Sequence, residues 1–354
     1  MADRPDIVIA GFPKAGTTAL ATLLAGHSQA ALIEPKEPHR FSWGLEPDLP
    51  ARARANALSA ADYAAAVAAA RRRGRLVIDA STSYTHPAVI EGTARRLKEA
   101  CPNLRVILTV RDPRKRLVSD WRMRHAEGWA ESRLSAEVRR NLTGLSAAVG
   151  AADDADLIAR LAASRDWLGP DRPAGRGTIT VVAGGFYDPL IAVYRQTFGD
   201  ALLVIPQEAL RRQPEQVLAR CFAHLGLDPE PVSDADGEFN VGDHRVETGL
   251  SRLLRRTGVA WAARTLLPHA LVARVRHGLT RAPEPGIDDL AGSPEAAVVE
   301  QLYALLSAQT ETRMADEFGV RWGHSSPIQS GGAATSPAPI STHSASGASP
   351  RRPA

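Results

Sequence analysis

The sequence predicts an α/β protein, a single domain with a central parallel β-sheet flanked by helices. Short runs that are apolar at nearly every position alternate with longer segments of helical periodicity. Strands buried on both faces have this pattern, and helices between them are typical of βαβ units, whose strands run parallel. The 354 residues, 44% of them hydrophobic, are enough for one large core. In such sheets ligands bind beyond the carboxyl ends of the strands, so residues that directly follow a strand are the first candidates for a site.

The predicted elements follow one another in βαβ order. Strand-like runs occupy DIVIAGF (6–12), RLVIDAS (75–81), LRVILTV (104–110), TITVVAG (178–184) and ALLVIP (201–206). Helical patterns begin at about Thr17 and at Pro113, and others cover approximately 60–72, 87–100 and 187–198. We expect the domain to span residues 1–324. Residues 325–354 are rich in Ser, Ala, Gly, Thr and Pro and lack the apolar side chains needed for a core, so we expect a disordered tail.

The composition narrows the class of protein. The net charge is +4, from 43 Lys and Arg against 39 Asp and Glu, and 5% of the residues are aromatic. So small a positive charge with so few aromatic residues argues against a nucleic-acid binder. The slight excess of positive charge suits a small polyanionic ligand. Cys101 and Cys221 lie outside any metal-binding spacing, so we expect ordinary thiols in a reducing, cytoplasmic compartment. The chain has no secretory signal and no apolar run of about twenty residues, so we expect no membrane span.

The segment after the first strand is a candidate phosphate-binding loop. Gly11 and Gly16 have the G-x-x-x-x-G spacing of a P-loop, which predicts a P-loop-like domain. Small residues let the backbone wrap a phosphate, and the N–H groups at a helix start hold the anion. A P-loop NTPase has its lysine directly after the second glycine, but here that place is Thr17 and the lysine is Lys14. An ordinary strand–turn–helix with an exposed lysine is the alternative. The predicted binding residues are Pro13, Lys14, Ala15, Gly16, Thr17 and Thr18.

A second candidate anion site follows the third strand-like run. Arg111 leaves the sheet there, and a helix is predicted to start at once because Asp112 is a good N-cap and Pro113 a good first helical residue. Ser119 lies two turns along this helix, and a guanidinium with a hydroxyl suits a phosphate. Two such sites at nearby strand ends predict a ligand with two separated phosphates. The alternative is that the basic residues 114–116 form only a solvated helix face.

Together, GFPKAGTT (11–18) and RDPRKRLVSDW (111–121) closely resemble the two signature motifs of sulfotransferases that use 3′-phosphoadenosine 5′-phosphosulfate, or PAPS. By motif order the likeness covers roughly residues 6 to 323, and it is greatest to the heparan-sulfate and carbohydrate-directed branch. The resemblance implies that the first loop binds the 5′-phosphosulfate and that Arg111 with Ser119 binds the 3′-phosphate. An ammonium over the bridging oxygen would stabilise the charge of the leaving phosphate without a metal ion, which is the expected role of Lys14.

The acceptor hydroxyl must lose its proton during transfer, so a general base is needed. The segment EPKEPHRF (34–41) is similar to a K-E-x-x-F-like segment of the family, in which the glutamate is the base. Glu37 matches that position, and His39 is the rival base. A polar loop punctuated by prolines, without a catalytic role, is the alternative.

Further candidate side chains lie at the end of the second strand-like run and directly after it. The family usually has E-x-[ST]-P-x-Y here, so Asp79 stands in the place of the glutamate and Thr82 in the place of the proline. Ser81 and Tyr84 keep their places, which implies that they position the sulfate or the acceptor. A tyrosine packed over a turn is the equally weighted alternative.

Two other positions are carried over from the family. Tyr187, in GGFYDPL, matches a tyrosine that lines the cleft, against the alternative of a core aromatic. Arg245 stands in for a K-G-R segment that contributes to the cofactor site. The stretch 250–281 has seven arginines and no acidic residue. It suits peripheral contact with an anionic membrane surface, contact with an acidic acceptor, or a solvated helix face.

These features predict a PAPS-dependent sulfotransferase that moves the sulfuryl group to an acceptor hydroxyl by in-line displacement. The expected acceptor is a carbohydrate, a glycolipid or a glycosylated metabolite, with a small alcohol as a further alternative, and no metal is expected. The alternative is a P-loop kinase or NTPase-like phosphotransferase, which would need a lysine at position 17 and a metal-binding aspartate at the end of a strand. In LTVRD, Arg111 stands before that aspartate. The sequence predicts neither the identity of the acceptor nor the oligomeric state.

Overall fold

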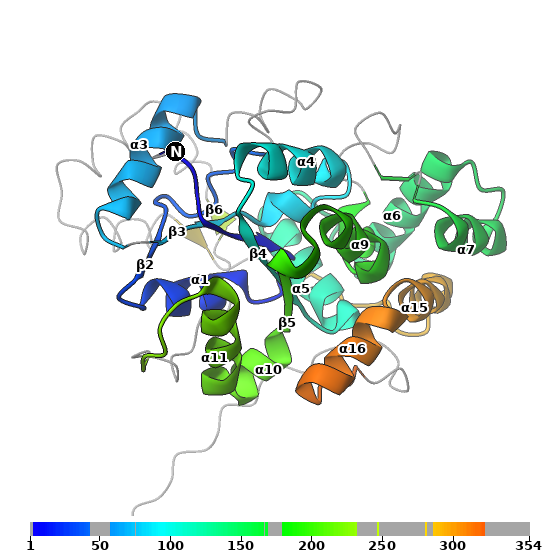
Figure 1. The fold of residues 1–354 in the computed structure, drawn as a ribbon. Coiled ribbons are helices and arrows are strands. Elements are labelled where there is room, and N and C mark those ends of the chain that lie inside the picture. The colour runs from blue at the N-terminus through cyan, green and yellow to red at the C-terminus, as the bar shows by residue number, and fades with distance from the viewer. Residues whose placement is uncertain are drawn as a thin grey trace, which may run out of the picture.

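The computed structural model describes residues 3–42, 57–74, 76–165, 167–168, 179–231, 246–247, 280–281 and 286–322. They form an α/β fold in which a five-stranded parallel sheet lies between layers of helices (Figure 1). The predicted fold class is therefore confirmed. The expected tail from residue 325, Arg245 and nearly all of the basic stretch 250–281 lie outside the described residues.

The sheet has its most buried strand at the centre. Its strands are β1 (Ile7–Gly11), β2 (Ala30–Leu32), β3 (Leu76–Ala80), β4 (Arg105–Val110) and β5 (Leu202–Pro206), in the order β2-β3-β1-β4-β5. Every residue of β1 is buried, as expected for a strand that is apolar throughout and covered on both faces. From β1 the chain continues toward β2, and from β4 it continues toward β5 on the other side. The carboxyl ends of β1 and β4 therefore form the switch point where sheets of this kind bind ligands.

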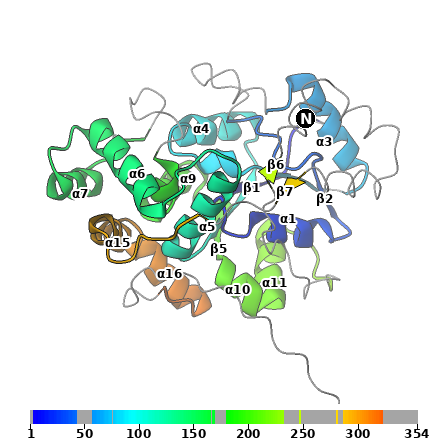
Figure 2. The same cartoon turned by 180° about the vertical axis from the view of Figure 1, so that it is seen from behind.

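Helices cover both faces of the sheet. One face carries α1 (Thr17–Ala25) and α11 (Pro214–Leu225), and the other carries α3 (Ala60–Arg71), α4 (Ile90–Ala100) and α9 (Tyr187–Phe198) (Figures 1 and 2). A lateral group contains α5 (Pro113–Ala126), α6 (Leu134–Val149), α7 (Asp154–Ala163), α8 (Thr180–Ala183), α15 (Pro294–Leu306) and α16 (Ala308–Phe318). The other elements are α10 (Gln207–Arg212), the 3₁₀ turns η2 (Thr82–Thr85) and η3 (Gly199–Ala201), and the strand pair β6 (Val246–Glu247) and β7 (Thr280–Arg281). Among the described helices, none is long and apolar enough to cross a membrane.

The described part of the apolar run at 178–184, from residue 179 on, is not a strand, so that prediction is wrong. It forms the short helix α8, which packs against α5 and α6. Side chains from other helices bond its backbone: Arg116 and Tyr303 donate to its valine carbonyls, and the N–H of Val182 donates to Asn141 Oδ1 at 3.2 Å. These bonds satisfy groups that a neighbouring strand would otherwise have to satisfy. A short apolar run has no period that separates a buried strand from a buried helical turn.

The start of α5 follows the prediction. Asp112 Oδ1 accepts a hydrogen bond from the N–H of Arg114 at 2.9 Å and Pro113 is the first helical residue, so the helix begins directly after Arg111. The alternative of a solvated basic face is wrong for two of its three residues. Arg114 is 6% exposed and Arg116 is fully buried, and each pairs with a carboxylate. The pair of Arg114 with Glu300 joins the first turn of α5 to α15, whereas the pair of Arg116 with Asp120 lies within α5.

Candidate active site

The loop after β1 and the first residue after β4 meet at the carboxyl edge of the sheet. β1 and β4 are neighbours in the sheet, with Gly11 in register with Leu108. The guanidinium of Arg111 donates from Nη1 to the backbone carbonyl of Lys14 at 3.3 Å. The structure therefore brings together the two segments that were predicted to bind anions.

Two glycines give the first loop its shape. Gly11 has φ +152° and Gly16 has φ +89°, values that residues with side chains rarely adopt. A β-carbon at Gly11 would clash with the hydroxyl of Thr85, so the loop begins tightly against the turn that follows β3. Gly16 is the N-cap of α1 and offers no side chain to the first N–H groups of that helix. A helix start of this kind, at Thr17 and Thr18, suits an anion.

Lys14 is subject to charges of both signs. Burial lowers the pKa of its ammonium below 10.5; the charges of Asp120 and Glu127 act to raise that pKa, and the charge of Arg111 lowers it. Both carboxylates come from α5 and its C-cap, seven residues or about two turns apart, and so lie on one face of the helix. The carboxylates on this face of α5 therefore act electrostatically on the ammonium of Lys14.

The residues predicted around the second anion site differ in how exposed they are. Ser119 is partly exposed on α5, and Arg111 is partly buried, with burial lowering the pKa of its guanidinium. Tyr187 is fully buried, and its hydroxyl donates to the backbone carbonyl of Arg111 at 2.7 Å. In this structure Tyr187 therefore contacts the backbone of the site and does not line its surface.

The three predicted catalytic residues share an unusual backbone conformation. Lys14, Glu37 and His39 have φ values of 65°, 64° and 53°, and they are the non-glycine residues with positive φ in the described part of the chain. Such conformations cost roughly 1–3 kcal/mol each and persist only where the surroundings hold them. They are also concentrated at functional sites, so the strain itself supports the choice of these three positions.

The carboxylate of Glu37 is held by three neighbours. Lys36 Nζ lies 2.9 Å from Oε1, Thr82 Oγ1 donates to Oε2 at 2.8 Å, and His39 Nε2 lies 3.8 Å from Oε2. Burial raises the pKa of Glu37, but the charge and hydrogen bond of Lys36, the Thr82 hydroxyl and the His39 ring together hold it below its ordinary value of 4.5. The group is therefore a carboxylate at neutral pH, the form that can accept a proton.

His39 is the partner of this carboxylate. Its Nδ1 lies 2.7 Å from Ser83 Oγ, so both ring nitrogens have polar neighbours. Burial lowers the pKa of His39, with the charge of Glu37 opposing and that of Lys36 adding to the effect. The side chain of His39 is 13% exposed and that of Glu37 is 30% exposed, which leaves Glu37 the more accessible of the two candidate bases.

Ser81 and Tyr84, the residues predicted to position sulfate or acceptor, are buried around Asp79. The Asp79 carboxylate accepts hydrogen bonds from Ser81 Oγ (2.8 Å), Tyr84 Oη (2.7 Å) and Tyr63 Oη (2.9 Å). Burial raises the pKa of Asp79 to about 6, against the lowering effect of these hydrogen bonds. The packed alternative therefore describes Tyr84 better than direct contact with a ligand does.

Sequence reasoning missed several side chains of this site. Thr82 was noted only as a departure from proline, yet its hydroxyl binds Glu37. Burial lowers the pKa of His86 to about 4, the charge of Arg124 lowers it further and that of Asp120 opposes. The spacing of seven residues between Asp120 and Glu127 could have indicated that both carboxylates lie on one face of the helix. Nothing in the sequence indicated that these carboxylates would act on Lys14.

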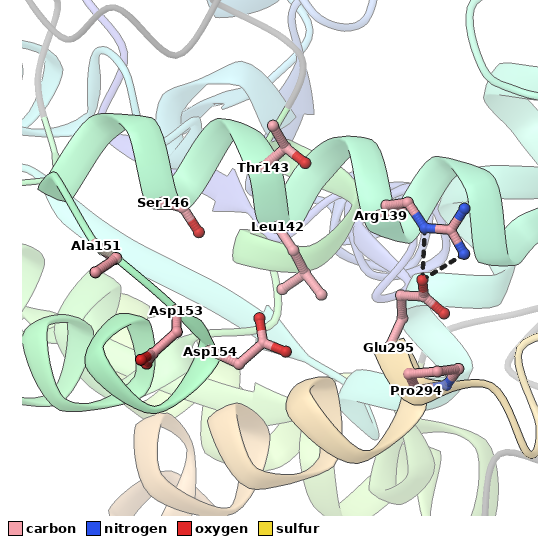
Figure 3. A pocket seen from close by; sticks show the side chains of 10 residues that line it. Arg139, Leu142, Thr143, Ser146, Ala151, Asp153, Asp154, Pro294 and Glu295 are labelled. Carbon is pink, nitrogen blue, oxygen red and sulfur yellow. Dashed lines mark hydrogen bonds and ion pairs between the residues drawn. The ribbon is translucent and has the colours of Figure 1, made fainter.

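A separate cavity lies in the lateral helices. It has a volume of about 290 Å³ and is bordered by α6, the start of α7 and the start of α15 (Figure 3). The ion pair between Arg139 and Glu295, at 2.6 Å, closes one side. None of the predicted site residues lines this cavity. In the described part of the chain, no group of three or more His, Cys, Asp and Glu side chains is placed to hold a metal ion.

Comparisons with known proteins agree with the sequence resemblance. Residues 5–173 match the model of the sulfotransferase family. The crystal structure of a sulfotransferase from Alicyclobacillus acidocaldarius matches with a TM-score of 0.50 and 23% identity, over 77% of this chain and 96% of that one. This similarity supports the fold.

Two further solved structures match at lower scores. The sulfotransferase domain of the Synechococcus PCC 7002 olefin synthase has a TM-score of 0.41 and 17% identity, over 86% and 94% of the two chains. The sulfotransferase domain from the curacin biosynthetic pathway has a TM-score of 0.40 and 18% identity, over 86% and 97%. None of the curated protein sequences compared with this chain matches it.

Proposed function

Residues 5–173 belong to the sulfotransferase family, and from that premise we propose that the protein moves the sulfuryl group of PAPS to an acceptor hydroxyl. One observation carries the choice of donor. The hydrogen bond from the Arg111 guanidinium to the backbone carbonyl of Lys14 shows that the two cationic residues that follow β1 and β4 lie at the same edge of the sheet. Two adjacent anion sites suit a nucleotide with a phosphate at each end, and family membership supports PAPS in particular.

The residues of the first site fit the 5′-phosphosulfate end of such a donor. The loop from Pro13 to Thr18 offers backbone N–H groups at the uncapped start of α1. As the bond between sulfur and the bridging oxygen breaks, negative charge gathers on that oxygen. The Lys14 ammonium is proposed to stabilise this charge. Arg111 and Ser119 are proposed to hold the 3′-phosphate, with Tyr187 fixing the backbone of Arg111.

Glu37 is the proposed base. As the acceptor oxygen forms its bond to sulfur, its proton passes to the Glu37 carboxylate, and the products are the sulfated acceptor and adenosine 3′,5′-bisphosphate. The ionised state and greater exposure of Glu37 favour it over His39. His39 then acts as its neighbour, 3.8 Å away. For the acceptor, the sequence resemblance supports a hydroxyl on a carbohydrate, glycolipid or glycosylated metabolite. A panel of such compounds, incubated with sulfate-labelled donor, tests this class.

Binding of the proposed product should raise the melting temperature in the absence of Mg²⁺. A ligand that binds only the folded state at 100 times its Kd adds about 2.7 kcal/mol to the free energy of unfolding. We therefore expect adenosine 3′,5′-bisphosphate to give a clear thermal shift and adenosine 5′-phosphate a smaller one. Stabilisation by Mg-ATP alone would instead support the phosphotransferase alternative and contradict the proposed donor.

Arg111→Ala should weaken binding of the nucleotide that carries a 3′-phosphate. Loss of hydrogen bonds to a charged group costs about 1.5–3 kcal/mol, which corresponds to a 10- to 100-fold rise in Kd. Calorimetry with adenosine 3′,5′-bisphosphate and with adenosine 5′-phosphate should show the loss only for the former. Arg105→Ala is the matched control, because Arg105 is exposed at the opposite end of β4. Equal losses for both nucleotides in the Arg111 variant would refute the second anion site.

A further inference from the structure

The buried acid Asp79 has no part in the proposed reaction, although it lies close to the segment of the proposed base. Asp79 is the next-to-last residue of β3 and is fully buried, and its carboxylate accepts hydrogen bonds from Tyr63, Ser81 and Tyr84. A carboxylate offers acceptors only, so three converging hydroxyl donors are well matched to it. With a pKa raised by burial to about 6, Asp79 is ionised at neutral pH and can accept all three bonds.

Two of these hydroxyls continue to the loop that carries the proposed base. Ser81 Oγ accepts a hydrogen bond from the N–H of His39 at 3.1 Å, and Tyr84 Oη accepts one from the N–H of Phe41 at 3.4 Å. A hydroxyl has one hydrogen, and here that hydrogen points to Asp79, which leaves the oxygen lone pairs for the loop amides. The buried charge therefore fixes the direction of both bonds.

The loop needs such support because its backbone is strained. Glu37 and His39 both have positive φ, and a strained conformation persists only when surrounding contacts hold it. Ser83 adds a side-chain link, since its Oγ lies 2.7 Å from both His39 Nδ1 and Ser42 Oγ. The turn after β3 and the segment 37–42 are thus joined along their length.

We propose that Asp79 is a positioning residue that holds the strained 37–41 loop through the hydroxyls of Ser81 and Tyr84 and so aims the Glu37 carboxylate at the site. The catalytic half of this inference rests on the proposed role of Glu37, whereas the structural half does not. Asp79 itself touches no reacting atom. Its effect passes through the backbone of the loop.

Asp79→Asn tests the proposal, because asparagine keeps the shape but replaces one acceptor oxygen with a donor. The amide hydrogens of His39 and Phe41 should exchange with solvent at least about tenfold faster, as expected when a hydrogen bond worth about 1.4 kcal/mol is lost. We expect kcat for sulfuryl transfer to fall about 10- to 100-fold. The Kd for adenosine 3′,5′-bisphosphate should stay within about twofold, because the Lys14 loop is untouched.

Three further variants separate positioning from a general loss of stability. Ser81→Ala removes one link with Asp79 still in place, and it should speed exchange at His39 even if Asp79→Asn fails to fold. Tyr63→Phe removes a bond to Asp79 that leads to no amide of the loop, so His39 should keep its exchange rate. Glu137→Gln alters a fully buried carboxylate in α6 and should lower the melting temperature without selective exchange at His39.

Exchange measurements distinguish failure of this inference from failure of the proposed function. Unchanged exchange at His39 and Phe41 in both Asp79→Asn and Ser81→Ala would overturn the positioning role, whatever the activity. If the wild-type protein transfers no sulfate but exchange responds as expected, the proposed function fails and the anchor remains. Faster exchange at the amides of His39 and Phe41 together with a normal kcat in Asp79→Asn would show that Asp79 holds the loop but that the position of Glu37 does not depend on it. That result would also overturn the proposal.

Discussion

Lys14→Ala is expected to lower the rate of sulfuryl transfer roughly 100- to 1,000-fold, the loss typical of removing one preorganised group that stabilises transition-state charge. Lys14 lies in the loop after β1, where the guanidinium of Arg111 donates a hydrogen bond to its backbone carbonyl. The charges of Asp120 and Glu127 act on its ammonium. Alanine removes the cation. A positive φ at residue 14 disfavours alanine no more than lysine, because both have a β-carbon, so the substitution adds no backbone strain. Single-turnover transfer of labelled sulfate measures the effect separately from product release.

A pH profile adds a second test of Lys14. The group must be protonated to stabilise the leaving oxygen, so activity should fall as the pH rises through its pKa. Because burial lowers that pKa, the alkaline fall should begin at a lower pH than the ordinary value of 10.5 implies. Lys115→Ala is the control, since that side chain is 65% exposed on α5. Normal turnover in Lys14→Ala would remove the ammonium from the mechanism.

Glu37→Gln is expected to lower transfer by about 100- to 10,000-fold, the range for loss of a general base. Glutamine is nearly isosteric and keeps an acceptor for the Thr82 hydroxyl, but it cannot take a proton at neutral pH. Affinity for adenosine 3′,5′-bisphosphate should stay within about twofold, because the nucleotide residues lie in other segments. Initial rates with labelled donor, together with calorimetry of nucleotide binding, measure the two quantities.

Two matched variants sharpen this result. Glu34→Gln changes a glutamate in the same segment whose side chain is 76% exposed, and it should leave transfer nearly unchanged. His39→Gln should cause a smaller loss than Glu37→Gln if His39 is only the neighbour of the base. A Glu37→Gln enzyme with wild-type turnover, combined with an inactive His39→Gln enzyme, would transfer the role of base to His39.

Local rules account for most of what could be predicted. The start of α5 follows from an N-cap aspartate and a proline in consecutive positions, and the strand before it follows from an unbroken apolar run. The loop 13–18 was identified by the spacing of Gly11 and Gly16. Each of these signals lies within about ten residues of chain. The prediction of a strand at 178–184 failed because that signal is shared by strands and buried helices.

The site beyond those local signals depends on contacts between distant segments. The turn after β3 meets the segment 37–42 across more than forty positions of sequence, and there Thr82 binds Glu37 while Ser81 binds the amide of His39. Such pairings arise from the order β2-β3-β1 and from buried packing, neither of which leaves a periodic trace in the sequence.

The sequence by itself determined the class of fold, the position of the candidate anion-binding loop and the identity of the charged candidates, because backbone propensity, capping and apolar patterning act over short stretches. Only the tertiary structure decided that Lys14 and Arg111 adjoin, that Tyr187 is buried against the backbone of Arg111, and that Asp79 is linked through Ser81 to the amide of His39. These relations require strands to be stacked in register, so that side chains far apart in the chain share one buried edge.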